Sequence, residues 1–189
     1  EIFLKNDFKI NKNRDKPLIL YTGNIGVGQG SHKIIPKAAN ELKEIQFRLI
    51  GDGSAIRQLT NNHLFKLQTN IEVLNPVLRG ELIKEYQEAD ILFLHVDDYK
   101  AFYKVLPSKI FEYAATGKPI LAGVSGYAAK FLRNQVLGVE VFNPCDVEAM
   151  KAGLQKLLSG PKEIDRKIFC TTYNRKKIMK KIARNILSI

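Results

Sequence analysis

Short, mainly apolar runs separated by helix-length segments recur along this chain, and this alternation limits its fold more than any other feature. A strand that is apolar on both sides must be buried on both sides, which is the situation of strands in a parallel sheet. The helices between the strands then cover the two faces of the sheet. The runs that we expect to form strands are 18–21, 47–50, 71–74, 91–95, 120–122 and 139–142.

These runs predict an α/β fold, namely a doubly wound Rossmann-like parallel sheet of about six strands with helices on both faces. The 189 residues are enough for one domain with a sizeable core. We expect Ser54 to cap a helix that runs to about Phe65, and Asp146 to cap a helix that runs to Gly160. Further helices are expected at 31–43, 81–88 and 127–133, and a single basic helix at the end of the chain.

The stretch from Val105 to Gly123 is expected to form a loop, a short helix, a tight stop and a buried strand. Ser108 is placed to cap this helix, and Gly117 to end it in a left-handed conformation. One carboxylate, that of Glu112, then lies early on the polar side of the helix beside the sheet. Such a carboxylate is suited to accept hydrogen bonds from the hydroxyl groups of a ligand.

The net charge limits the kinds of partner that the chain can bind. The sequence has 30 Lys and Arg residues and 19 Asp and Glu residues, which gives a net charge of +11. Such an excess favours an anionic partner, for example a phosphorylated ligand, a nucleic acid or an acidic membrane surface. Eight cations and no acid lie between Arg166 and Arg184, in the last helix. A solvated surface and a membrane-surface role are both open for that helix.

Metal and disulfide chemistry find little support in the sequence. Cys145 and Cys170 stand apart without metal-ligand spacing, and the three histidines are scattered. We therefore expect two reduced thiols and no metal site. No apolar run approaches the roughly 20 residues that a membrane-spanning helix needs.

Two unusual loops are expected to meet at one edge of the sheet. In a six-strand doubly wound sheet the chain changes direction between the first and fourth strands, and ligands bind outside the carboxyl ends of those strands. The loop after the first strand is the glycine-rich segment 23–30, and the loop after the fourth runs from Val96 through Lys104. The sequence therefore predicts a ligand crevice between these two loops.

The glycine loop by itself leaves alternatives open. Its backbone N–H groups could approach a phosphate at the start of a helix, or its four glycines could simply form a tight turn. It has neither the Gly-Lys-Ser/Thr of a P-loop nor the Gly-x-Gly-x-x-Gly of a dinucleotide-binding loop, which disfavours an NAD-dependent enzyme. Asp52 lies in Gly-Asp-Gly after the second strand, for which a plain turn is the preferred interpretation.

Four motifs follow one another along the chain: Tyr-Thr-Gly-Asn-Ile-Gly, Leu-Ile-Gly-Asp-Gly-Ser, Ala-Asp-Ile-Leu-Phe-Leu and Pro-Ser-Lys-Ile-Phe-Glu-Tyr-Ala-Ala-Thr-Gly-Lys-Pro. In this order they resemble family-four retaining glycosyltransferases of the two-domain B-type fold, in particular the bacterial O-antigen and capsule branch that includes L-fucosamine transferases. The resemblance implies a linker at 1–16 from an N-terminal acceptor domain missing from this chain, a nucleotide-sugar-binding domain at 17–160, and a basic C-terminal helix at 161–189.

The resemblance also implies a UDP-sugar as the donor substrate and gives roles to individual residues. Glu112 matches the glutamate that holds the ribose hydroxyl groups. The residues expected to line the base are Asn75, Pro76, Val77 and Arg79. The residues expected near the donor diphosphate are Gly23, Asn24, Gly26, Gln29, Gly30, Lys104, Ser108 and Lys109, with Gly26 nearest. The family needs no metal and no other cofactor, so none is expected here.

The chain departs from the family pattern where positive charge is needed. Lys104 stands in the place of the first glutamate of the family's paired-glutamate motif, and Asn24 and Gln29 stand where many members have Arg and Lys. A leaving diphosphate needs positive charge in the transition state. Lys104, Lys109, Arg79 or the missing half of the protein would have to supply it.

The leading hypothesis is the donor-binding half of a retaining glycosyltransferase in bacterial surface polysaccharide synthesis, inactive in sugar transfer by itself. Its expected partners are a nucleotide-sugar donor, a lipid-linked acceptor and an anionic membrane surface, but no nucleic acid. The expected location is the cytoplasm, including the inner face of the cytoplasmic membrane. The alternative is a non-catalytic basic Rossmann-like module that binds nucleic acid or a membrane surface, although interleaved aromatic and basic residues of the RNA-binding kind are lacking.

Overall fold

The computed structural model describes residues 14–187, so most of the expected linker at 1–16 lies outside the described residues. Within them, six strands form one sheet in the order β3-β2-β1-β4-β5-β6, and all neighbouring strands are parallel. This confirms the predicted doubly wound order, with its change of direction between β1 and β4. The strands are β1 Leu18–Thr22, β2 Gln46–Ile50, β3 Ile71–Leu74, β4 Ile91–His95, β5 Ile120–Gly123 and β6 Val139–Phe142.

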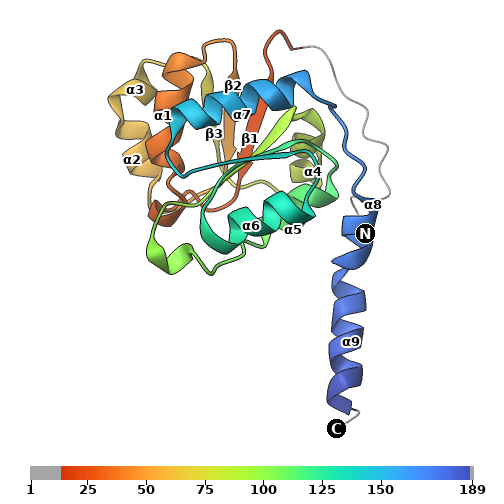
Figure 1. Cartoon of the computed structure of the whole chain (residues 1–189). Coiled ribbons are helices and arrows are strands. Elements are labelled where there is room, and N and C mark those ends of the chain that lie inside the picture. Colours follow the sequence, from red (N-terminus) through yellow and green to blue (C-terminus); the bar gives the residue numbers. More distant parts are fainter. Residues whose placement is uncertain (1–13, 188–189) are drawn as a thin grey trace.

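Helices cover both faces of the sheet, which buries its central strands on two sides (Figure 1). One face carries α1 Ser31–Glu41, α2 Ile56–Asn61, α3 His63–Lys66 and α7 Val147–Ser159. The other face carries α4 Arg79–Glu88, α5 Lys109–Ala115, α6 Gly126–Gln135 and α8 Lys167–Thr172. Two short 3₁₀ helices, η1 Val27–Gln29 and η2 Lys100–Phe102, lie in the loops after β1 and β4.

The helix expected from Ser54 to Phe65 is two helices, so that prediction was wrong. Ser54 precedes α2 without capping it, because Ala55 occupies the N-cap position. The helix stops at Asn62, whose side-chain oxygen accepts a hydrogen bond from the N–H of Leu64 at 2.9 Å and begins α3. An Asn side chain competes in this way with the continuing helix for the backbone N–H groups.

The predicted caps elsewhere have mixed outcomes. Ser108 precedes α5 but makes no side-chain cap, because its φ of −60° and ψ of −24° are helical and a capping residue needs an extended backbone. The carboxylate of Asp146 does cap α7, accepting from the N–H of Ala149 at 2.9 Å. Gly117 ends α5 with a left-handed φ of +76°, as predicted.

The segment after Gly160 also forms two helices instead of one. Phe169 of α8 is buried and stacks on Phe111 of α5, with ring centroids 6.0 Å apart. Before α8, the buried Arg166 donates hydrogen bonds to the carbonyl groups of Leu137 at 2.8 Å and Lys118 at 2.9 Å. The second helix, α9 Arg175–Leu187, projects away from the body of the molecule (Figure 1).

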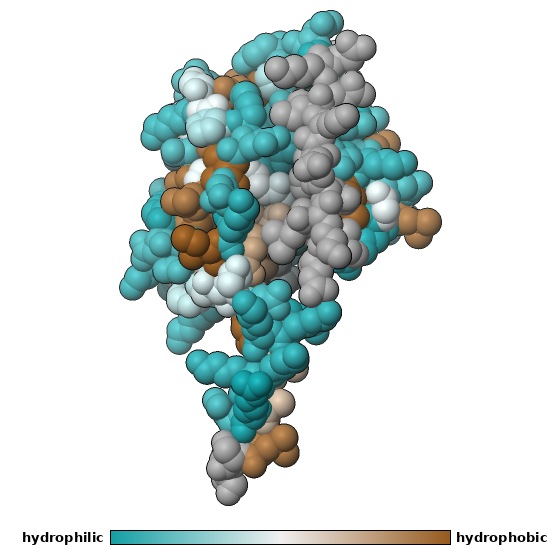
Figure 2. Space-filling model, turned by 90° about the vertical axis from the view of Figure 1, so that its right-hand side faces the viewer, coloured by the Kyte–Doolittle hydropathy of each residue, from teal (hydrophilic) through white to brown (hydrophobic). Residues whose placement is uncertain are grey.

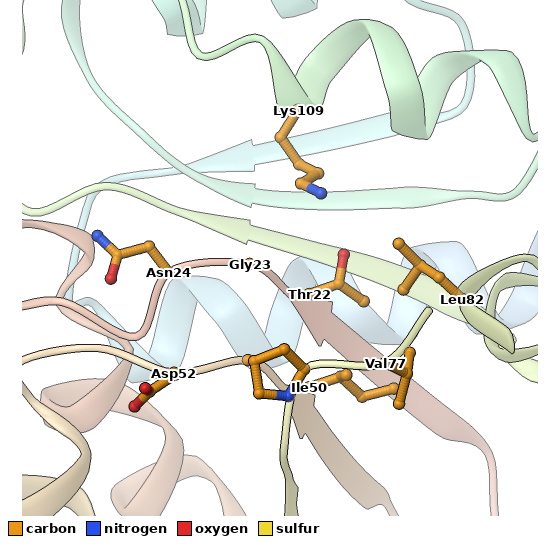
Figure 3. Close-up of a pocket in the computed structure, with 10 residues that line it drawn as sticks. Thr22, Gly23, Asn24, Ile50, Asp52, Val77, Leu82 and Lys109 are labelled. Atoms are coloured by element: carbon orange, nitrogen blue, oxygen red, sulfur yellow. The ribbon is translucent and has the colours of Figure 1, made fainter. Parts of the chain in front are cut away.

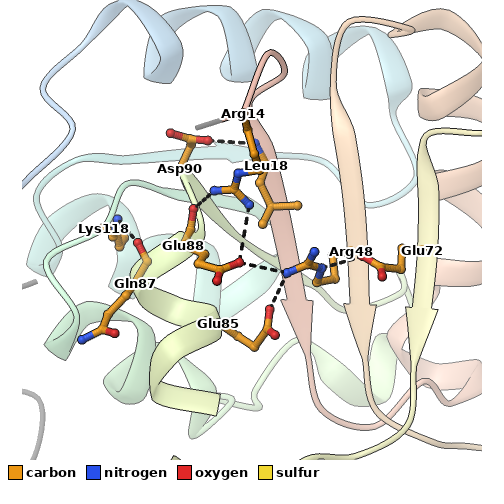
Figure 4. Close-up of polar contacts among 9 residues, drawn as sticks. All are labelled: Arg14, Leu18, Arg48, Glu72, Glu85, Gln87, Glu88, Asp90 and Lys118. Atoms are coloured by element: carbon orange, nitrogen blue, oxygen red, sulfur yellow. Dashed lines mark hydrogen bonds and ion pairs between the residues drawn. The ribbon is translucent and has the colours of Figure 1, made fainter. Parts of the chain in front are cut away.

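A charged network attaches α4 to the sheet (Figure 4). Arg48 on β2 donates to Glu72 on β3 at 2.7 Å, and to Glu85 and Glu88 on α4 at 2.7 and 3.2 Å. Burial would lower the pKa of Arg48, but the bonds to Glu72 and Glu85 outweigh it and raise that pKa. The guanidinium therefore stays charged and holds α4 in register with two strands.

Three buried hydroxyl groups join the end of β1 to α4 and α5. The N–H of Thr22 donates to the hydroxyl of Tyr113 at 3.0 Å, and Oγ1 of Thr22 lies 2.9 Å from the hydroxyl of Tyr86 and 3.2 Å from that of Tyr113. Burial raises the pKa of both tyrosines, so the hydroxyl groups keep their protons. This cluster fixes the position of α5 relative to the carboxyl end of β1.

We expect Tyr113→Phe to lower the free energy of unfolding by about 1–3 kcal/mol, because the buried N–H of Thr22 loses its partner. Urea denaturation followed by circular dichroism measures this loss. Tyr173→Phe is the matched control, because the contact of the Tyr173 hydroxyl with Gln135 is exposed, and it should cost less than about 0.5 kcal/mol. Equal losses in the two variants would contradict a special role for Tyr113.

Candidate functional site

A cavity of about 330 Å³ opens at the carboxyl ends of β1 and β2, beside the point where the sheet order reverses (Figure 3). It is lined by Thr22, Gly23, Asn24, Ile50, Gly51, Asp52, Pro76, Val77, Leu82 and Lys109. Strands β1 to β3 therefore contribute through their ends and following loops, α4 through Leu82 and α5 through Lys109. This is the edge of the sheet at which the sequence predicted a ligand crevice.

The floor of the cavity is two loops packed backbone to backbone. The N–H of Gly23 donates to the carbonyl of Ile50 at 2.9 Å, and the N–H of Ile25 donates to the carbonyl of Asp52 at 2.8 Å. A Cβ at position 51 would overlap the carbonyl group of Gly23, so only glycine allows this approach. The Gly-Asp-Gly turn after β2 thus shapes the cavity as well as reversing the chain.

Several N–H groups of the glycine loop 23–30 donate hydrogen bonds to other backbone groups. The N–H groups of Gln29 and Gly30 donate to the carbonyl groups of Gly26 and Val27, both at 3.1 Å, which forms η1. Those of Gly23 and Ile25 are used by the loop after β2. Within the described structure, the loop N–H groups that take part in no backbone bond are those of Asn24, Gly26, Val27 and Gly28.

His95, at the end of β4, supports the glycine loop from the side of the sheet. Its ring is 1% exposed, with Nδ1 2.6 Å from the carbonyl oxygen of Gln29 and Nε2 2.9 Å from the backbone nitrogen of Cys145. A carbonyl only accepts and an N–H only donates, so Nδ1 carries the proton and Nε2 accepts. Burial lowers the pKa of His95 to about 4, which keeps the ring neutral.

Asp97 links the loop after β4 to the glycine loop through its backbone and to α1 through an ion pair. Its N–H donates to the carbonyl of Gly28 at 2.9 Å, and its carboxylate lies 2.5 Å from Nζ of Lys33. Burial would raise the pKa of Asp97, but the hydrogen bond and charge of Lys33 together with the N–H of Asp98 outweigh it, and the pKa is lowered. The neighbouring Asp98 instead accepts from the hydroxyl of Ser125 at 3.0 Å, so the two carboxylates serve different partners.

Lys109 and Glu112 form an ion pair at the side of the cavity. Nζ of Lys109 lies 2.8 Å from Oε2 of Glu112, and the two side chains are 25% and 31% exposed. Figure 3 shows Lys109 reaching from α5 toward Gly23, between Asn24 and Leu82. Lys109 lines the cavity. Glu112 does not line it, but its carboxylate contacts Lys109.

The structure brings together five of the predicted ligand-binding residues around this cavity: Gly23, Asn24, Pro76, Val77 and Lys109. Glu112 adjoins them through Lys109, and the side chain of Gln29 accepts a hydrogen bond from that of Asn24 at 3.2 Å. The predicted residues that do not line the cavity are Gly26, Gln29, Gly30, Asn75, Arg79, Lys104, Ser108 and Glu112. Lys104 lies in the exposed loop after η2, and Arg79 begins α4.

Five lining residues were not among the predicted ones: Thr22, Ile50, Gly51, Asp52 and Leu82. The glycine-flanked Asp52 was a visible signal, but a plain turn also explains it. That turn exists, since Oδ1 of Asp52 accepts from the N–H of Gly53 at 2.7 Å, and the same residue lines the cavity. Ile50 and Leu82 gave no signal, because an apolar residue beside a site looks like a core residue in the sequence.

Metal ligands are lacking in the described structure: no three His, Cys, Asp or Glu side chains within residues 14–187 are grouped so as to hold a metal ion. Cys145 lies near Asp97, with Sγ 3.7 Å from Oδ1, and burial raises the pKa of its thiol. The cavity lining consists of two glycines, four apolar residues, the polar residues Thr22 and Asn24, and the charged residues Asp52 and Lys109.

A doubly wound parallel sheet with a glycine-lined cavity beside its switch point defines an α/β domain of the Rossmann-like class. The chain belongs to the Glycosyl transferases group 1 family, whose sequence model matches residues 3–177. A search of curated protein sequences gave no match.

Solved structures show the same fold. Anabaena HepE in complex with UDP and glucose superposes with a TM-score of 0.75 and 15% identity over 93% of this chain and 49% of that one. The lipopolysaccharide outer core galactosyltransferase WaaB in its apo form superposes with a TM-score of 0.66 and 16% identity, over 89% of this chain and 47% of that one. A trehalose-6-phosphate structure from E. coli bound with UDP-2-fluoro glucose superposes with a TM-score of 0.61 and 17% identity, over 78% of this chain and 37% of that one. The chain thus spans half or less of the length of these neighbours.

We expect the free energy of unfolding to fall by up to about 3 kcal/mol as the pH is lowered from about 6.5 to about 4. In that window the unfolded chain protonates His95, whereas the native protein, with the pKa of His95 at about 4, does not, so protons favour unfolding. Urea denaturation over a series of pH values measures the profile.

Comparing the stability profiles of two variants separates the contribution of His95 from that of the other groups that titrate in acid. His95→Gln should be less stable near pH 7 and lose less stability across the window. His63 is exposed, so His63→Gln should keep the profile of the parent protein. Parallel profiles for the parent and His95→Gln would refute this account of His95.

Proposed function

We propose that this chain is the donor-binding half of a retaining glycosyltransferase that uses a UDP-sugar and transfers a hexosyl or amino-sugar group, in the manner of L-fucosamine transferases. The observation that carries the proposal is the cavity at the switch point, where the glycine loop meets the start of α5. Membership of the glycosyltransferase family supports the reaction type. HepE, which shares the fold, was solved with UDP and with UDP-glucose.

The base would lie against the apolar side of the cavity. Pro76 and Val77 follow β3, and Leu82 projects from the first turns of α4, which Arg48 holds against the sheet. A planar base stacks on such side chains and is removed from water. Asn75 and Arg79 flank this segment and would contact the edge of the base from outside the cavity.

The diphosphate would lie over the glycine loop. The N–H groups of Asn24 and Gly26 are not used in the described backbone network, and the loop leads into α1, whose N-terminal end favours anions. Gly26 is covered by the side chains of Asn24 and Gln29, which contact each other. In this proposal polar amides replace the usual cations of the loop, and Lys109 supplies the charge nearest to the phosphates.

The ribose would exchange places with Lys109 at the carboxylate of Glu112. In the structure Lys109 holds this carboxylate at 2.8 Å. If the ammonium group turns toward the incoming phosphates, Glu112 becomes free to accept hydrogen bonds from the two ribose hydroxyl groups. The exchange leaves neither group without a partner, because the phosphates replace the carboxylate as the partner of Lys109 and the ribose hydroxyl groups donate to Glu112.

The transfer itself would need the second half of the protein, which would hold the acceptor across the cleft. We propose a lipid-linked acceptor and a role in O-antigen or lipopolysaccharide assembly at the inner face of the cytoplasmic membrane, to which the fold likeness to WaaB lends support. The proposal requires no metal and no further cofactor. The chain alone would bind donor without transferring sugar.

The first test is isothermal titration of the chain with UDP. We expect binding, and we expect Glu112→Ala to weaken it by about 1–3 kcal/mol, because the bonds to the ribose hydroxyl groups are lost. Glu148→Ala is the matched control: this carboxylate is exposed on α7, away from the cavity, and its loss should leave the affinity unchanged. Absence of binding at millimolar UDP by the folded chain would count heavily against the proposal, and an unchanged affinity in Glu112→Ala would remove Glu112 from the site.

A second titration separates the two roles open to Lys109. If Lys109 pairs with the phosphates, Lys109→Gln should lower the affinity for UDP by about tenfold or more. The affinity for uridine, the weaker ligand, should hardly change. If Lys109 only positions Glu112, the variant should lower the affinities for UDP and for uridine by the same factor. Lys130→Gln, an exposed cation on α6, is the control for general charge effects.

A further inference from the structure

The glycine loop has its carbonyl groups held by hydrogen bonds, whereas several of its N–H groups are not. Every carbonyl from Asn24 to Gly30 accepts a hydrogen bond in the described structure. The donors are the hydroxyl of Tyr21, the ring of His95 and the N–H groups of Gln29, Gly30, Lys33, Ala55 and Asp97. A loop with this asymmetry presents the positive ends of its peptide dipoles to a ligand.

The same asymmetry separates an anion-binding loop from a plain turn. Gly26 is buried, yet its N–H takes part in no backbone bond in the described structure. Buried N–H groups are rarely left without a partner in proteins. An anion over the loop would accept from this N–H and from those of Val27 and Gly28, which are also unused by the backbone. The loop is therefore suited to hold phosphates without a cation of its own.

The positive charge of the chain lies mostly away from this loop. Helix α9 carries six Lys or Arg residues, and it projects away from the body of the molecule. Figure 2 shows it below the body as a largely hydrophilic segment. Lys33, at the start of α1, is paired with Asp97, so Lys109 is the cation among the described residues that line the cavity. The backbone of the loop must then supply much of the attraction for a diphosphate.

Two buried side chains act on this backbone from beneath. The hydroxyl of Tyr21 donates to the carbonyl of Asn24 at 2.6 Å, and Nδ1 of His95 donates to the carbonyl of Gln29 at 2.6 Å. Tyr21 is 5% exposed and His95 1% exposed. The two residues that they hold are those whose side-chain amides meet over Gly26. Tyr21 and His95 thus fix both ends of the run that contains the unused N–H groups.

We propose that Tyr21 and His95 are positioning residues for the diphosphate of the donor, an inference that rests on the proposed function. They act by keeping the carbonyl groups of Asn24 and Gln29 turned into the domain. Peptide units beside glycine rotate easily, because no Cβ restricts them. A released carbonyl that turned outward would set a partial negative charge beside the phosphates, and the N–H groups of the loop would lose their common direction.

Isothermal titration of the full 189-residue chain with UDP, uridine and inorganic pyrophosphate tests the proposal. Tyr21→Phe removes one hydroxyl and keeps the ring. We expect it to lower the affinities for UDP and for pyrophosphate by about fivefold, which corresponds to one hydrogen bond. The affinity for uridine should hardly change, because uridine has no phosphate to meet the loop.

Variants of His95 supply a second, independent measurement. His95→Leu removes the bond to Gln29 and should lower the affinities for UDP and pyrophosphate by at least about fivefold. His95→Gln keeps a donor and an acceptor in a side chain of similar reach, so it should recover part of this affinity. A purely structural role would predict no such recovery of phosphate binding relative to uridine binding.

The matched control is a buried side chain that holds carbonyl groups elsewhere. Asn70 lies before β3, at the opposite edge of the sheet, and its amide donates to the carbonyl groups of Leu42 and Ile45, both at 2.9 Å. Asn70→Ala loses bonds of the same kind. It should make the chain less stable while leaving the affinities for UDP, pyrophosphate and uridine unchanged at a temperature where the variant is folded.

The outcomes separate this proposal from the donor site on which it rests. Equal weakening of UDP and uridine by Tyr21→Phe, or an unchanged affinity for pyrophosphate, would overturn the roles of Tyr21 and His95. So would a loss of pyrophosphate binding in Asn70→Ala equal to that in Tyr21→Phe. If the parent chain binds pyrophosphate but not UDP, the donor site fails, and the pyrophosphate affinities of the variants still decide the present proposal. If the parent chain binds neither ligand, both fail.

Discussion

The hydroxyl of Tyr113 holds the backbone of Thr22, and the position of the cavity depends on this buried contact. It ties α5 to the carboxyl end of β1, the strand at the centre of the sheet order, while Tyr86 ties α4 to the same Thr22. Because α5 bears Lys109 and α4 bears Leu82, these bonds place both side chains beside the glycine loop. A shift of α5 by one turn would move Lys109 about 5.4 Å along the helix axis and out of the cavity.

Charge near the cavity is arranged in closed pairs. Lys33 is committed to Asp97 below the glycine loop, and Lys109 is committed to Glu112 beside it. The first pair is part of the scaffold, since Asp97 also bonds the backbone of Gly28. In the second pair Lys109 lines the cavity, which makes it the pair that an anionic ligand in the cavity can open. Position in the fold therefore separates a structural ion pair from a functional one.

The fold was largely predictable because burial on both sides forces continuous apolar strands, and the run from Leu18 and the run from Ile91 both show this. Local rules also placed the cap at Asp146 and the stop at Gly117 correctly. They failed at Ser54 and Ser108, where neighbouring backbone angles decide whether a hydroxyl can reach an N–H group. The predicted residues that line the cavity lie at the start of the glycine loop, after β3 and at the start of α5. Ile50 and Leu82, in contrast, look like any core residue until the strands are assembled.

The sequence by itself determined the order of the strands and the edge of the sheet where ligands would bind, because both follow from periodicity and topology. Only the tertiary structure decided which side chains face the cavity. It showed that Lys109 is paired with Glu112, that Gly51 must be glycine beside Gly23, and that the last basic segment is two helices. These are contacts between residues distant in the chain, and their geometry depends on how the packed elements meet.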